Sequence, residues 1–211
     1  MPLIDGAGAV GDPASKSFST SQLTTVDQDM CTGIGVSVLL RNWTLPDREN
    51  TTFATAAEEQ LDYLLNVAPR APNGAISQRE SQVQLWADFV YMAPPFIAYY
   101  GALEDESTGQ DLLQTAYDQV RLYREVLYDQ NVSLWRHIAL GDGTDPTHWA
   151  TGNAWAAAGM MRVLATIQQS CVASEMIQQQ CDLEQWVGEI LDGAWGFQVS
   201  VVSLVLTAIE N

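Results

Sequence analysis

Residues 152–169 read GNAWAAAGMMRVLATIQQ, and this stretch decides the fold class. The spacing of Asn153, Ala156, Ala157, Met160 and Leu164, most of them apolar or small, places their side chains on one face of an α-helix. The small side chains among them allow a second helix to approach closely. The stretch therefore predicts a long helix that packs against other helices.

The same helical spacing recurs on both sides of this stretch. We expect further helices at about residues 51–67, 80–92, 110–128 and 182–195. Asp182 is a plausible cap for the last of them, and Pro94 with Pro95 should bend or break the chain after the second. No strand-like alternation competes with this series, so the expected fold class is all-α, built from successive helical hairpins.

The two ends of the chain differ from this pattern. Residues 1–29 are rich in Gly, Ser, Thr and Asp and predict a flexible arm, after which a helix can begin near Met30. The helical domain should then occupy residues 30–195, followed by an atypical tail at 196–211. The apolar run in that tail is shorter than the roughly 18 to 20 residues that span a bilayer.

The formal charge of −17 limits the partners. Such a surface repels nucleic-acid phosphates and anionic lipid headgroups, so we expect neither nucleic acid nor membrane as a partner. The first residues lack the pattern of a secretory signal, but the glycosylation acceptors Asn42, Asn50 and Asn131 favour a secreted, extracellular protein. Cys171 and Cys181 fit a disulfide and a pair of reduced thiols about equally well.

The richest loop is LWRHIALGDGTDPTHWATGNAW, residues 134–155. An indole face suits the C–H face of a sugar ring, so tryptophans in and near this loop suggest a carbohydrate site. The candidates are Trp86, Trp135, Trp149 and Trp155. Core packing is the competing explanation for each of them, because tryptophan is usually mostly buried.

Asp88 and Asp142 are the candidate catalytic carboxylates. Asp88 shares a predicted helix stripe with apolar residues, where desolvation would raise the pKa of a carboxyl group and let it deliver a proton. Asp142 lies in a glycine-flanked turn that a ligand can approach. A structural hydrogen bond for Asp88 and ordinary turn chemistry for Asp142 are the alternatives.

Metal and cofactor chemistry find little support in this loop. His137, Asp142, Asp145 and His148 are acceptable ligand types, but their spacing matches no established zinc arrangement. The chain also lacks a Gly-x-Ser-x-Gly elbow and Gly-rich phosphate motifs. We therefore expect neither a metal nor a cofactor.

Three stretches in succession resemble one known family. They are QLWADFVYMAPPFIAYYG (84–101), LYREVLYDQNVSLWRHI (122–138) and HWATGNAWAAAGMMRVLATI (148–167). In residue identity, order and spacing, they resemble glycoside hydrolase family 105, the unsaturated rhamnogalacturonyl hydrolases. The resemblance extends over about residues 30 to 193 and is closest to the fungal, secreted-type members. This family and its relative, family 88, have an (α/α)6 barrel of six helical hairpins, which the resemblance implies here.

The resemblance implies an unusual hydrolase for pectin-derived oligosaccharides that end in a 4,5-unsaturated uronic acid. An aspartate protonates C4 of the vinyl ether and water adds at C5, unlike ordinary displacement at the anomeric carbon. Asp88 matches one active-site aspartate, and Asp142 best matches the probable proton donor. By the same match, His137 lies beside the substrate, and Trp149 with Asn153 forms the wall that holds the sugar ring. The expected substrate-binding residues are these three together with Trp86, Thr151 and Trp155.

This sequence departs from the family pattern at two points. Thr151 stands where many members have an arginine, which removes a bidentate partner for the uronate carboxylate. The interval from His137 to Asp142 is also longer than usual, which makes Asp145 the alternative catalytic carboxylate.

Length sets a further expectation. Twelve helices and their connections need roughly 300 residues at about 11 or 12 residues per helix, so we expect only part of the barrel here. An incomplete barrel would expose apolar helix faces and favour self-association. A non-catalytic carbohydrate-binding remnant and an all-α interaction module are the competing functional hypotheses.

Overall fold

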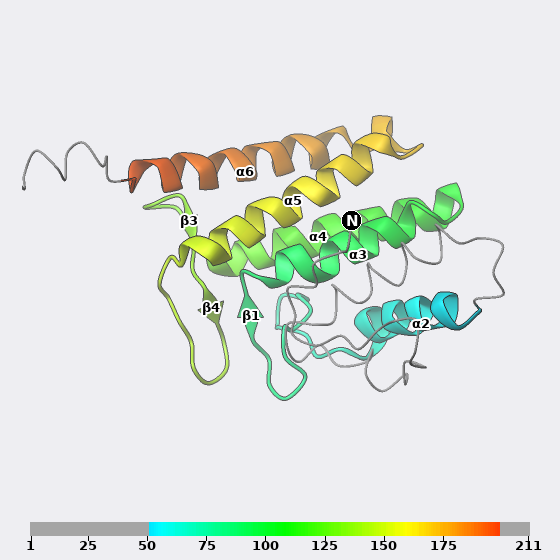
Figure 1. Ribbon diagram of the computed structural model, residues 1–211, viewed down its shortest axis with the longest axis horizontal. Helices are drawn as coiled ribbons and strands as arrows, with labels where there is room; N and C mark the ends of the chain where they lie inside the picture. Colours follow the sequence, from blue (N-terminus) through cyan, green and yellow to red (C-terminus); the bar gives the residue numbers. More distant parts are fainter. Residues whose placement is uncertain (1–50, 199–211) are drawn as a thin grey trace, which may run out of the picture.

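The computed structural model describes residues 51–198. The predicted arm, the helix expected from Met30 and the tail beyond residue 198 lie outside them, as do Asn42 and Asn50. Within the described part, the helices run alongside one another, with α6 at one edge of the view in Figure 1, α2 at the other, and α3, α4 and α5 between them. The all-α prediction is confirmed.

The helices largely follow the sequence prediction. Their bounds are Thr51–Asp62 (α2), Phe89–Gly101 (α3), Glu106–Leu127 (α4), Ala150–Gln169 (α5) and Ile177–Gly196 (α6). A π-helical stretch, Tyr63–Val67, extends α2, and a short 3-10 helix, Ala173–Glu175, precedes α6. Asp105 caps α4, because its side chain accepts a hydrogen bond from the Thr108 amide at 3.1 Å.

Short strands connect the helices, which the sequence did not predict. β1 (Leu85–Trp86) pairs antiparallel with β4 (Ile138–Ala139), and β2 (Tyr128–Asp129) pairs antiparallel with β3 (Leu134–Trp135). Each strand is two residues long, too short to show the alternation that reveals a strand in sequence.

The prediction for residues 80–92 was wrong in two respects. This segment contains β1, and α3 begins only after Asp88. The helix also continues through Pro94 and Pro95 instead of breaking. Pro94 has no N–H to donate to the carbonyl of Val90, but α5 covers that carbonyl closely: a Cβ on Gly159 would lie 2.1 Å from Val90 O. Packing between helices therefore outweighs the local proline signal.

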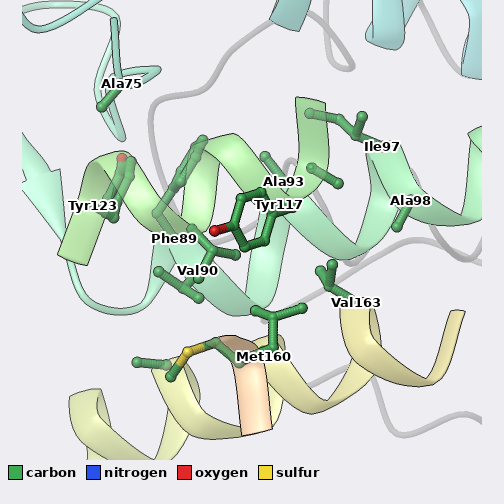
Figure 2. Close-up of a cluster of buried hydrophobic side chains, with 14 of the residues drawn as sticks. Ala75, Phe89, Val90, Ala93, Ile97, Ala98, Tyr117, Tyr123, Met160 and Val163 are labelled. Carbon is green, nitrogen blue, oxygen red and sulfur yellow. The ribbon is translucent and has the colours of Figure 1, made fainter. Parts of the chain in front are cut away.

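The core lies where α3 meets α4 and α5. Figure 2 shows Val90 of α3 near Met160 of α5, and Val163 of α5 lies nearer to Ala98 of α3. On the side towards α4, the ring of Phe89 stacks on Tyr123 with centroids 4.8 Å apart. The buried apolar contacts on both sides of α3 fix the end of this helix that carries Asp88.

α4 and α6 lie side by side in parallel, and their contacts recur at a constant interval. Gln110–Glu175, Gln114–Gln179, Tyr117–Asp182 and Arg124–Glu189 are hydrogen-bonded pairs, each 65 residues apart in sequence. Two successive hairpins, α3–α4 and α5–α6, therefore repeat one arrangement, as expected for part of an (α/α) barrel.

Asp182 does not cap a helix, contrary to the prediction. It lies inside α6, where its Oδ2 accepts a hydrogen bond of 2.5 Å from the Tyr117 hydroxyl. Burial and this bond raise the pKa of Tyr117. The tyrosine ring also stacks on Trp186, with centroids 5.7 Å apart.

Tyr117→Phe should lower the free energy of unfolding by about 1 to 2 kcal/mol, because it removes this hydrogen bond and keeps the ring. Urea denaturation measures the change. Asp182→Asn should also destabilise, and the double variant should cost less than the sum of the two. Strictly additive losses would show that the two side chains do not interact.

The outward faces of α5 and α6 carry exposed apolar side chains. Met161 is 48% exposed, Leu191 60% and Trp195 75%. Such faces were expected of an incomplete barrel, and self-association through them stays a proposal. Cys171 and Cys181 are exposed and free, so they form no disulfide with one another. No helix among residues 51–198 combines the length and apolarity needed to cross a bilayer.

Candidate active site

Strand pairing places His137 between the segment that carries Asp88 and the segment that carries Asp145. On one side, its carbonyl accepts a hydrogen bond of 2.9 Å from the Ala87 amide. On the other, its amide donates to the Thr147 carbonyl at 2.9 Å, and Ile138 forms a β-bridge with Asp145. Residues that are distant in sequence therefore converge on one histidine.

The two imidazole nitrogens of His137 face two carboxylates. Nε2 lies 3.5 Å from Oδ2 of Asp88, and Nδ1 lies 3.0 Å from Oδ2 of Asp145. The Asp88 and His137 side chains are 13% and 16% exposed, whereas that of Asp145 is 37% exposed. Asp88 and His137 are thus largely shielded from water, whereas Asp145 is partly open to it.

Two tryptophans stand beside the imidazole. The Trp86 ring meets it edge-on with centroids 5.5 Å apart, and the Trp149 ring lies 4.6 Å away at a tilt of 47°. Trp149 is 43% exposed, so its indole presents area to solvent. We call Trp86, Asp88, His137, Asp145 and Trp149 the His137 cluster.

Two helices begin at this cluster. Asp88 is the N-cap residue of α3, yet its side chain makes no capping bond to that helix and turns towards His137 instead. Trp149 is the N-cap residue of α5. Both helices thus direct their positive N-terminal ends towards the cluster, which favours a negatively charged group of a ligand there.

The ionised carboxylate of Asp145 determines which nitrogen of the His137 imidazole carries a proton. Its pKa is lowered to about 2, first by the hydrogen bond with His137 and then by those with the Thr147 hydroxyl and amide. An ionised carboxylate only accepts hydrogen bonds, so we assign a proton to Nδ1 of His137. Nε2 of the imidazole then faces Oδ2 of Asp88. A carboxyl group held in this position is a candidate for delivering a proton to a substrate.

The lowered pKa of Asp145 predicts an acid-sensitive contribution to stability. Its stabilising effect should be complete above the unfolded value of 3.8 and disappear as the pH falls towards about 2. Asp145→Asn should therefore lower the urea midpoint at pH 6 but not near pH 2. A difference between the two proteins that persists at pH 2 would contradict this assignment.

Asp142 is not joined to the cluster. Its amide donates to Oε1 of Gln82 at 2.8 Å, and its carbonyl accepts a hydrogen bond from the Gln84 amide group. Its exposed carboxylate has no hydrogen bond or ion pair with any of residues 51–198. The geometry thus favours Asp145, the alternative from sequence, over Asp142 as the second carboxylate of the site.

Asn153 is buried and holds the backbone of Trp135 and Trp149. It is 3% exposed, and its amide exchanges hydrogen bonds of 2.8 and 2.9 Å with the backbone of Trp135. It also donates to the carbonyl of Trp149 at 3.1 Å, which positions that residue at the start of α5. Trp135 is fully buried, so the core-packing interpretation holds for it.

Thr151 and Trp155 lie on the exposed side of the first turns of α5. Trp155 is 37% exposed and its ring lies 4.5 Å from that of Tyr91 rather than against His137. The predicted substrate-binding residues therefore fall into two neighbouring groups, the His137 cluster and the surroundings of Trp155.

Gly152 was not among the predicted site residues. A Cβ at this position would lie 3.2 Å from Cε3 of Trp149 and 3.7 Å from Cδ2 of His137. The absence of a side chain thus leaves room for both rings at the start of α5. A glycine within the first turn of a predicted helix, between two tryptophans, was the available signal.

Metal binding finds no support here. No group of three or more His, Cys, Asp or Glu side chains among residues 51–198 is placed to hold a metal ion. His148, one of the suggested ligands, lies instead beside Asp129, with Nε2 and Oδ2 3.3 Å apart.

The family model for Glycosyl Hydrolase Family 88 matches residues 22–186. The chain belongs to glycosyl hydrolase family 88. This confirms the resemblance to families 105 and 88. No curated protein matches the sequence significantly.

Solved structures show the same fold. A possible member of family GH105 from Salmonella enterica has a TM-score of 0.64 at 20% identity, covering 77% of this chain and 43% of its own. A possible GH105 member from Klebsiella pneumoniae has a TM-score of 0.64 at 18% identity, and the match covers 77% of this chain and 42% of that protein. A family 105 glycoside hydrolase from C. acetobutylicum has a TM-score of 0.65 at 14% identity, and the match covers 87% of this chain and 49% of that protein. This family 88 chain thus spans less than half the length of each.

Proposed function

We propose that this family 88 chain carries the site of a glycoside hydrolase that acts on 4,5-unsaturated uronyl oligosaccharides from pectin or rhamnogalacturonan. The observation that carries the proposal is the line of Asp88, His137 and Asp145 beside the rings of Trp86 and Trp149. Family membership supports the reaction class. The exposed indole of Trp149 offers a surface for the sugar ring.

In this mechanism Asp88 is the acid and base, and His137 positions it. Asp88 delivers a proton to C4 of the double bond, and positive charge develops at C5 and the ring oxygen. Water adds at C5, and the Asp88 carboxylate takes up the proton that the water loses. The hemiketal then opens at the bond between C5 and the ring oxygen, and the neighbouring sugar leaves from C1. The sum of these steps is the addition of one water molecule.

His137 and Asp145 keep Asp88 ready for this cycle. Asp145 holds the imidazole by its Nδ1, so Nε2 points at Asp88 in a fixed orientation. The positive ends of α3 and α5 favour the uronate carboxylate in the same place.

Two sets of oligosaccharides of equal length test the proposal. Fragments made by a pectin lyase carry the 4,5 double bond, whereas fragments made by a hydrolase do not. We expect the folded protein to remove the absorbance of the double bond and release a sugar from the first set only. If the absorbance of the double bond persisted at every mildly acidic pH in the presence of folded protein, the proposal would be contradicted.

The second candidate function is carbohydrate binding without turnover, which the exposed indole of Trp149 beside His137 favours. Binding without turnover predicts that both the lyase-made and the hydrolase-made oligosaccharides change the tryptophan fluorescence, and that neither is cleaved. An interaction module would show neither response.

We also propose an extracellular location. Asn131, one of the glycosylation acceptors, is exposed at the turn between β2 and β3, where an attached glycan would meet solvent. Mass spectrometry of protein secreted from a eukaryotic host would detect that glycan, and Asn131→Gln should remove it.

A further inference from the structure

Gln84 is a buried side-chain amide beside the His137 cluster. The residue is 2% exposed and immediately precedes β1. In an extended chain the side chains of alternate residues lie on the same face, which places Gln82, Gln84 and Trp86 together. Burial of an amide is costly unless its polar groups have hydrogen-bond partners. The partners of Gln84 therefore show which parts of the site it connects.

The amide of Gln84 bridges two separate segments. Its Oε1 accepts a hydrogen bond of 3.0 Å from Nε1 of Trp86, and its Nε2 donates to the carbonyl of Asp142. An indole N–H can only donate and a carbonyl oxygen can only accept, so the amide fits in one orientation alone. Gln84 thus links Trp86 to the backbone of Asp142, although the Asp142 carboxylate stays outside the cluster.

The loop at residues 140–143 is pressed against this amide. Leu140 and Gly141 have φ angles of 66° and 64°, so two successive residues in the left-handed region turn the chain back over Gln84. A Cβ on Gly141 would lie 2.8 Å from Cγ of Gln84 and 2.8 Å from Oε1 of Gln82. The loop therefore lies directly on Gln84, with no room for a side chain at Gly141.

The backbone of Gln84 is anchored as well. Its N–H donates to Oγ of Ser77 at 3.0 Å, and its carbonyl accepts a hydrogen bond of 2.8 Å from the Gln78 amide. Ser77 is fully buried. The amide of Gln84 is thus held at a fixed point, which lets it fix the groups that it bonds.

Trp86 passes this constraint on to His137. Its ring meets the imidazole edge-on, with centroids 5.5 Å apart and planes at 77°, and the Arg79 guanidinium lies 5.1 Å from its centroid. Nε2 of the same imidazole lies 3.5 Å from Oδ2 of Asp88. A displacement of the indole would therefore change the packing around the imidazole that faces Asp88.

We propose that Gln84 is a positioning residue of the site. Its amide fixes the indole of Trp86 against His137 and ties both to the 140–143 loop, so the orientation of the imidazole depends on one buried side chain. In this role Gln84 acts through Trp86 rather than through contact with the substrate. Its effect on catalysis rests on the proposed function, whereas its effect on Trp86 and His137 does not.

Two sets of NMR signals test the positioning without any substrate. The indole N–H of Trp86 is one of seven in the chain, and Trp86→Phe identifies its signal. In Gln84→Met, which has a side chain of similar length and no amide, this N–H should exchange with solvent about tenfold faster, as for the loss of one hydrogen bond. The imidazole nitrogen signals of His137 should shift too, whereas those of His148, the other histidine of the chain, should stay.

Gln82→Met is the matched control. Gln82 bonds the backbone of Asp142 from the same face of the segment, so its loss should leave the Trp86 and His137 signals in place. Gln84→Glu keeps an acceptor for the indole N–H and should preserve its slow exchange. Thermal unfolding shows whether each variant is folded, and Gln84→Leu provides a second variant without an amide. If the Gln84 variants without an amide left both signals unchanged, or if Gln82→Met moved them equally, the proposal would be overturned.

The consequence for the reaction is measured with a lyase-made oligosaccharide. Gln84→Met should lower kcat about tenfold, because a loosened Trp86 no longer fixes the imidazole that faces Asp88. KM should change less, since Trp149 and the starts of α3 and α5 are untouched. A loss confined to KM would overturn the proposal. If the wild-type protein hydrolyses nothing, the proposed function fails, and the NMR signals of Trp86 and His137 alone decide the role of Gln84.

Discussion

Replacing Gly159 by alanine should lower the free energy of unfolding by about 3 kcal/mol, because the new methyl group has no space. A Cβ there would lie 2.1 Å from the carbonyl oxygen of Val90 and 2.4 Å from its carbon. Both are backbone atoms of α3, so the clash can be relieved only by moving α3 and α5 apart. Urea denaturation followed by circular dichroism measures the loss.

Gly188→Ala is the control for this prediction. Gly188 also lies within a long helix, α6, but nothing lies within 4 Å of a Cβ placed on it. There the substitution should stabilise the protein by about 0.5 to 1 kcal/mol through the helix preference of alanine. If both variants changed stability equally, the close contact between α3 and α5 would not exist in solution.

Asp88→Asn should lower kcat by a factor of about 10² to 10⁴, because asparagine keeps the shape of the side chain but cannot deliver a proton. The substrate should still bind, since Trp86, Trp149 and the starts of α3 and α5 are unchanged. Steady-state kinetics on a lyase-made oligosaccharide separate the two effects.

Asp142→Asn makes the same chemical change at the exposed turn and should leave kcat nearly unchanged. Asp145→Asn should have an intermediate effect, because it releases His137 without removing the acid. Full activity of the Asp88 variant together with an inactive Asp142 variant would reverse the assignment of the proton donor.

Helical periodicity predicted most of the fold, because the buried face of a long helix repeats in sequence. α4 and α5 differ from the expected ranges only near their ends. The failures have a common cause. β1 pairs with β4, and Pro94 is tolerated because Gly159 packs against Val90, so in both cases the decisive contact comes from another part of the chain.

The candidate site was predicted in part for the same reason. Asp88, His137 and Trp149 were identified by residue type and family resemblance, and they do lie together. Sequence spacing could not choose between Asp142 and Asp145, because the choice depends on the bridge between Ile138 and Asp145.

The most direct test of the central claim follows the double bond of the substrate. An unsaturated disaccharide is incubated with the protein in D2O, and proton NMR records early time points. The vinyl signal of C4 should disappear at the rate at which the neighbouring sugar is released, with one deuterium entering one face of C4. Release of the sugar with the vinyl signal intact, or an unchanged substrate in the presence of folded protein, would contradict hydration by Asp88.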